Sequence, residues 1–76
     1  MWEEKDGKLV HEFKFDDFKS ALSFVDKIGA LAEQKNHHPD IELGWGRVKV
    51  LLFTHSEHKI TEKDKSLAKE IDQITS

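Results

Sequence analysis

The chain has 76 residues, of which 36% are charged and 37% hydrophobic, and its formal net charge is −3 at pH 7. A chain of this length forms one domain, 1–76, with a modest core, so self-association is a reasonable expectation. The sequence has no cysteine, which excludes a disulfide framework, a thiolate nucleophile and a cysteine zinc site. Acidic and basic residues are interspersed, so there is no basic patch of the kind that binds nucleic acid.

The first residues, 1–5, are charged and lack the apolar segment of a signal peptide. No apolar run approaches the length of a membrane span. Together with the lack of cysteine, these features predict a cytoplasmic protein that has no membrane segment.

The first half of the chain predicts a hairpin followed by a helix. Residues 2–5 and 9–15 are the two strands, and the second alternates between apolar and polar residues. Asp6-Gly7 between them is typical of a two-residue type I′ turn, in which both residues need a positive φ. Asp16 or Asp17 can cap the helix that follows.

An apolar stripe at helical spacing places this helix at about residues 17–34. The stripe consists of Phe18, Ala21, Leu22, Val25, Ile28 and Ala32. Pro39 biases His38 towards an extended backbone, so the helix must end before that point.

The second half predicts a short strand at 41–43, a turn at 44–47, a longer strand at 48–54 and a helix from Thr61. The longer strand is apolar on both faces, which indicates that a covering element or a partner subunit hides its second face. The order β-β-α-β-β-α therefore predicts an α+β two-layer sandwich, with a four-stranded antiparallel sheet and two helices on one face.

Three histidines and one acid fall at the ends of these elements. His37 and His38 stand between the first helix and Pro39, His55 follows the longer strand, and Asp64 lies in the first turn of the second helix. Imidazole exchanges protons readily near neutral pH, and element ends can form a cleft beside a rigid sheet. We therefore expect the three histidines to line one pocket, with Asp64 beside at least one of them.

Each residue also has a structural interpretation. The segment 61–64 resembles a capping box, and this pattern alone favours a structural role for Asp64. A lone histidine at the place of His55 is more often structural than catalytic. Glu33 is a solvated helix residue unless the histidine pair folds back on it. Trp2 and Trp45 are expected to be packing residues.

Metal binding is the rival chemical interpretation of these histidines. His55 and His58, together with the adjacent pair, supply enough ring nitrogens for a site. However, adjacent histidines on an extended backbone point to opposite sides, and the spacings fit no standard site. The sequence therefore favours proton transfer over metal ligation.

Several spaced segments together resemble the pterin-4a-carbinolamine dehydratase family. The segments are Glu33-Gln34-Lys35-Asn36-His37-His38-Pro39, Val48-x-Val50, Thr54-His55 and Thr61-x-x-Asp64-x-x-Leu67-Ala68. The resemblance covers nearly the whole chain, and it is the combination at matching spacing that is specific. It implies the same β-β-α-β-β-α fold. It also implies dehydration of 4a-hydroxytetrahydropterin to quinonoid dihydropterin, a step that recycles the tetrahydrobiopterin-type cofactor of aromatic amino-acid hydroxylases.

The resemblance also implies roles for individual residues. His37, His38 and His55 are the three active-site histidines, and His38 is our choice for contact with the leaving hydroxyl. The substrate-binding set, including the acids that orient the histidines, is Glu33, Pro39, Asp64 and Trp2. The family needs no metal, nucleotide or prosthetic group, and it acts on a pterin as a homodimer or homotetramer.

Two departures from the family pattern stand out, namely Ile41 in place of an aromatic residue and Lys59 in place of a glycine in the 56–61 loop. Neither touches a proton-transfer group. Some members of the family act instead as transcriptional coactivators, and others that share the fold act as assembly chaperones. Such binding needs no intact histidine set, so the presence of His37, His38 and His55 favours the enzyme.

Overall fold

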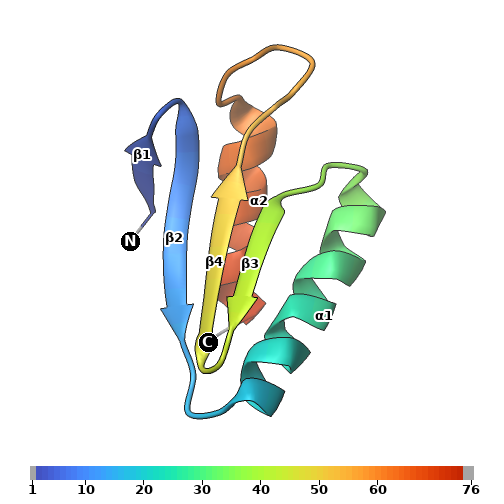
Figure 1. Ribbon diagram of the computed structural model, residues 1–76. Coiled ribbons are helices and arrows are strands. Elements are labelled where there is room, and N and C mark those ends of the chain that lie inside the picture. Colours follow the sequence, from blue (N-terminus) through green and yellow to red (C-terminus); the bar gives the residue numbers. More distant parts are fainter. Residues whose placement is uncertain (1, 75–76) are drawn as a thin grey trace.

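The computed structural model describes residues 2–74, and it shows a four-stranded antiparallel sheet with two helices packed on one face (Figure 1). The strand order in the sheet is β1-β2-β4-β3. The elements are β1 (Glu3–Lys5), β2 (Lys8–Lys14), α1 (Phe18–Lys35), β3 (Asp40–Gly44), β4 (Arg47–Leu52) and α2 (Glu62–Ile74). This arrangement confirms the predicted α+β sandwich.

Helix α1 begins and ends with recognisable capping structures. Asp17 is its N-cap, and the carboxylate accepts a hydrogen bond of 2.7 Å from the Ser20 N–H. At the other end Asn36 adopts the left-handed conformation, with φ 52° and ψ 41°. The Asn36 N–H donates to the Glu33 carbonyl and the His37 N–H to the Ala32 carbonyl, which is the Schellman pattern. The helix end therefore fixes the path of the chain at His37.

Both hairpin turns depend on glycine. Asp6 and Gly7 have φ values of 53° and 76°, as the predicted type I′ turn requires. Gly46, in the β3–β4 turn, has a φ of 68°, and a Cβ there would lie 2.8 Å from the Phe15 carbonyl oxygen. The Phe15 N–H donates to the Gly46 carbonyl at 2.8 Å, so this turn is docked closely on the chain that leaves β2.

The core lies between the sheet and the helices. Strand β4, one of the two interior strands, directs Val48, Val50 and Leu52 into it, and all three are fully buried. Their partners come from both helices: Ala21, Phe24 and Ile28 from α1, and Leu67, Ala68 and Ile71 from α2. This shared cluster holds α1, α2 and β4 as one body.

The opposite face of the sheet is open. Leu51 and Phe53 of the predicted two-faced strand are half-buried, and between residues 2 and 74 no helix or strand covers them. Trp45 was expected to pack but is 73% exposed, because it stands at the tip of the β3–β4 hairpin. Within residues 2–74, neither helix is long and apolar enough to cross a bilayer.

Alanine in place of Gly46 and alanine in place of Gly29 should change the free energy of unfolding in opposite directions. Gly46→Ala should lower the free energy of unfolding by about 1–3 kcal/mol, because it forces a side chain into a left-handed, crowded position. Gly29→Ala is the matched control, since a Cβ on this helical glycine meets nothing within 4 Å. It should raise the free energy by up to about 1 kcal/mol. Urea unfolding of both variants checks the signs, and equal effects would contradict the account of the turn.

Candidate active site

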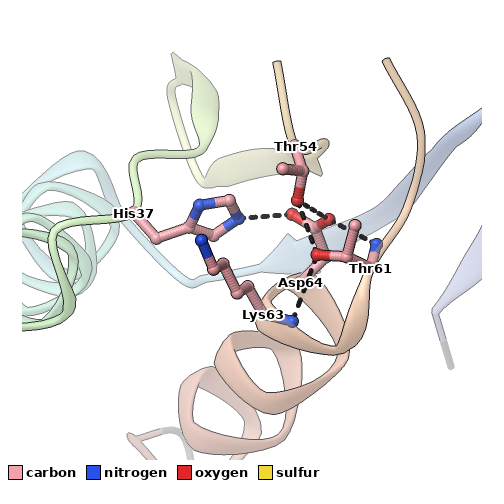
Figure 2. Close-up of polar contacts among 5 residues, drawn as sticks. All are labelled: His37, Thr54, Thr61, Lys63 and Asp64. Carbon is pink, nitrogen blue, oxygen red and sulfur yellow. Dashed lines mark hydrogen bonds and ion pairs between the residues drawn. The ribbon is translucent and has the colours of Figure 1, made fainter. Parts of the chain in front are cut away.

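His37, just after α1, and Asp64, in the first turn of α2, point toward each other (Figure 2). His37 Nε2 lies 2.6 Å from Asp64 Oδ1. Asp64 is fully buried, while the His37 side chain keeps 15% of its surface exposed. A buried carboxylate thus holds an imidazole that still reaches the surface.

Asp64 is held in place by the start of its own helix and by the end of β4. Its Oδ2 accepts hydrogen bonds from the Thr61 N–H at 2.9 Å and from the Thr54 hydroxyl at 2.7 Å. The first of these is the reciprocal half of the predicted capping box. The other half is altered, because Thr61 Oγ1 accepts from the Lys63 N–H at 3.3 Å. Asp64 therefore caps the helix and also orients a histidine.

The surroundings keep Asp64 ionised. Burial raises the pKa of this carboxyl, but the hydrogen bonds from Thr54, His37 and the Thr61 backbone outweigh burial and hold the pKa below its ordinary value of 3.8. Within residues 2–74, every buried side-chain nitrogen and oxygen has a hydrogen-bond partner. At neutral pH the carboxylate is consequently an acceptor only.

A cavity of about 450 Å³ opens beside His37. Figure 2 shows Lys63 on the same side of Asp64 as the His37 ring, and both residues border this cavity. The full lining consists of Lys35, Asn36, His37, Glu62, Lys63, Ser66 and Leu67. The space accommodates a small polar molecule in contact with the imidazole.

His38 turns away from its neighbour. Its Nε2 lies 2.5 Å from Glu33 Oε2, and both side chains are mostly exposed. His38 alone of the two has therefore folded back on Glu33, so Glu33 has a histidine partner although its side chain stays exposed. The half-buried Pro39 follows His38 on the way into β3. Adjacent residues on an extended backbone face opposite ways, and here His37 binds Asp64 while His38 binds Glu33.

His55 takes a third direction. It opens the 55–58 loop, is exposed, and packs edge-on against Phe53 with ring centroids 5.2 Å apart. Phe53 follows the buried Leu52, and the Lys8 ammonium lies 5.8 Å from its ring centroid, so this pair belongs to the open face of the sheet. Within one chain His55 does not border the cavity beside His37. Its catalytic role stays a prediction.

Trp2 lies elsewhere. Its indole N–H donates to Asp72 Oδ1 at 3.0 Å, and Asp72 stands eight residues after Asp64 on α2. Eight residues of helix correspond to roughly 12 Å. Trp2 thus packs the first strand against the far part of α2, and within one chain it does not reach the His37–Asp64 pair.

Two features of the loop after β4 were not visible in the sequence. Thr54, only 3% exposed, donates a hydrogen bond to the Asp64 carboxylate. In the sequence, beside His55, it looks like an ordinary strand residue. The left-handed residue of the loop is His58, with φ 53°, so Lys59 is tolerated where the family often has glycine. In the part of the chain from 2 to 74, no cluster of three or more His, Cys, Asp or Glu residues is arranged to hold a metal ion.

The lowered pKa of Asp64 makes its contribution to stability depend on pH. Asp64→Asn should lower the free energy of unfolding by about 1.5–3 kcal/mol at neutral pH, because hydrogen bonds to a charged group are lost. The folded pKa lies below the unfolded one, so the wild-type advantage is present above about pH 4 and is lost as pH falls through the folded value. Urea unfolding at several pH values should show the two stability curves converging in acid. The exposed Asp26→Asn is the control, and a gap that persists undiminished in acid would contradict the prediction.

Comparison with known proteins gives consistent results. Residues 1–74 match the model of the family described as pterin 4 alpha carbinolamine dehydratase. A Rubrobacter xylanophilus protein named "Putative pterin-4-alpha-carbinolamine dehydratase" is 45% identical over 74 residues, covering 96% of this chain and 69% of its own length. A relative of the same name from Alkaliphilus metalliredigens is 48% identical over 68 residues, covering 90% of this chain and 61% of its own length.

Solved structures share the fold. A crystal structure described as a transcriptional coactivator/pterin dehydratase from Brucella melitensis superposes with a TM-score of 0.93 at 35% identity, covering 99% of this chain and 82% of that one. A pterin dehydratase-like protein identified as a RuBisCO assembly factor has a TM-score of 0.77 at 24% identity, covering 96% and 84%, a likeness of fold alone. By sequence and by structure, the chain belongs to the pterin-4a-carbinolamine dehydratase family.

Proposed function

We propose that this protein dehydrates a pterin-4a-carbinolamine to the quinonoid dihydropterin, as a step in recycling a tetrahydrobiopterin-type cofactor. The observation that carries the proposal is the His37 imidazole, held by the buried Asp64 carboxylate and bordering a cavity. Family membership supplies the substrate class.

The reaction moves protons and breaks one bond, without any change of oxidation state overall. The C4a–O bond breaks, and the departing oxygen takes up a proton and leaves as water. N5 loses its proton, and the electron pair of the N–H bond becomes the new N5=C4a double bond. One acid and one base are therefore required, and imidazole can serve as either near neutral pH.

The surroundings of the histidines support a division of labour. His37 has one nitrogen committed to an ionised carboxylate, which suits a base that accepts the N5 proton. His38 is exposed and paired with Glu33, which suits contact with the leaving hydroxyl. His55 is the third proposed member, and it stands on the exposed loop after β4. Pro39 and Trp2 stay proposed substrate contacts.

A substitution at His38 tests whether this residue is the acid that protonates the leaving hydroxyl. His38→Ala should lower turnover of synthetic carbinolamine by about 10²-fold, the usual effect of losing one positioned acid or base. The fold should survive, because His38 is exposed and its partner Glu33 is solvated. His58→Asn is the matched control, since asparagine tolerates the positive φ at that position. A well-folded His38→Ala variant with unchanged turnover would remove His38 from the mechanism.

A protein-binding role is the second candidate. The Brucella relative, 35% identical, is described as a transcriptional coactivator as well as a pterin dehydratase. Apolar side chains also remain on the surface, namely Phe18, Leu22 and Trp45. Binding of this kind does not require imidazoles, so a variant without His37, His38 and His55 that keeps full biological function would favour it over catalysis.

We also propose that the protein is a homodimer or homotetramer. Strand β3 has a partner on one side only, and such an edge invites pairing with another chain. Helix α1 packs along β3 (Figure 1), and one turn apart it exposes Phe18 by 43% and Leu22 by 42%. Apolar surface next to a free edge is typical of an interface.

The oligomer prediction is checked by light scattering across a dilution series. The wild type should give at least twice the 8.8 kDa mass of the chain, and Leu22→Lys should shift the population towards the monomer. Lys19→Ala, an exposed change in the same helix, is the control. A wild-type mass near 8.8 kDa at every concentration would contradict self-association.

A further inference from the structure

Each hydrogen bond around Asp64 has only one possible direction. An ionised carboxylate can only accept, so the single proton of the Thr54 hydroxyl must point to Asp64 Oδ2, 2.7 Å away. The Thr54 and Thr61 hydroxyl oxygens are also 2.7 Å apart. Because the Thr54 proton already points to Asp64, the Thr61 hydroxyl must be the donor in this second contact.

The chain of donors begins in the backbone of α2. The Lys63 N–H donates to Thr61 Oγ1, Thr61 donates to Thr54, and Thr54 donates to Asp64 (Figure 2). Asp64 Oδ2 also receives the Thr61 N–H. Two donors thus hold Oδ2, and together with His37 at Oδ1 they orient the carboxylate.

The other oxygen then determines the tautomer of His37. Oδ1 lies 2.6 Å from His37 Nε2 and cannot donate, so Nε2 must carry a proton. In the neutral ring the second nitrogen, Nδ1, is then the one that holds the lone pair.

We propose that Thr54 and Thr61 are positioning residues for His37. Their one-way hydroxyl chain orients Asp64 so that His37 keeps its proton on Nε2 and presents Nδ1 as the proton acceptor. The use of that acceptor for the N5 proton rests on the proposed function, whereas the tautomer itself does not.

Both hydroxyls are placed by rigid structure. Thr54 is anchored by the bridge to Lys59, in which the Thr54 N–H donates to the Lys59 carbonyl at 3.0 Å. Thr61 is anchored at the start of α2, where its carbonyl accepts from the Asp64 and Lys65 N–H groups. In metal sites, side chains that support a coordinating residue in this way commonly change activity by about 10- to 100-fold when they are lost, and we expect an effect of that size here.

The test is the tautomer of His37, read from the ¹⁵N shifts of the ring and the proton couplings of its nitrogens across a pH series that ends where the ring is neutral. A His37→Gln spectrum assigns the signal. The wild type and Thr54→Ser should show a proton on Nε2. Thr54→Val has the same shape without the hydroxyl, and it should show a mixture of tautomers and about 10- to 100-fold lower turnover.

Thr61→Ser and Thr61→Val form a second pair in case Thr54→Val fails to fold, and serine should restore what valine removes. A Thr54→Val protein whose His37 keeps the wild-type tautomer would overturn the proposal, as would a wild type with its proton on Nδ1. An inactive wild type whose tautomer nevertheless shifts in Thr54→Val would refute the dehydratase function and uphold the positioning role.

Discussion

The ionised Asp64 carboxylate, buried at the junction of three chain segments, is the constraint on which the site depends. A buried charge is costly unless it is fully hydrogen-bonded. Its donors are the Thr54 hydroxyl at the end of β4, the Thr61 N–H at the start of α2, and His37 just after α1. The hydrogen bonds that stabilise the buried charge therefore also hold the ends of α1, β4 and α2 together at the site. In this small domain, the contacts that stabilise the fold are also the contacts that build the candidate site.

The remaining structure holds those segments still. The Schellman turn at Asn36 fixes the exit of α1, and the bridge from Thr54 to Lys59 fixes the exit of β4. Behind them, one apolar cluster of both helices and β4 forms the core. Among residues 2–74, neither helix covers the second face of the sheet, and β3 has a neighbouring strand on one side only.

Local patterns predicted the elements well, because their causes are local. The 3.6-residue stripe and the Asp17 cap placed α1 within one residue of its observed ends, and Asp6-Gly7 specified its turn. Side-chain direction at element ends depends on distant contacts instead. Within one chain His37, His38 and His55 therefore face Asp64, Glu33 and Phe53 respectively, and a pocket that all three share between subunits stays a prediction. The hydrogen bond from Thr54 to Asp64 was not predicted for the same reason, since Asp64 lies ten residues away, across a loop.

Whether the His37–Asp64 pair transfers the proton is tested by the turnover of synthetic carbinolamine by Asp64→Asn. The comparison is made per folded molecule, with folding checked by circular dichroism and Asp26→Asn as the reference. An amide keeps the shape of the carboxylate but can hold the imidazole in the wrong tautomer. If the pair transfers the proton, turnover should fall by at least about 10²-fold while the reference stays active. Equal turnover in the two folded variants would contradict proton transfer by the pair.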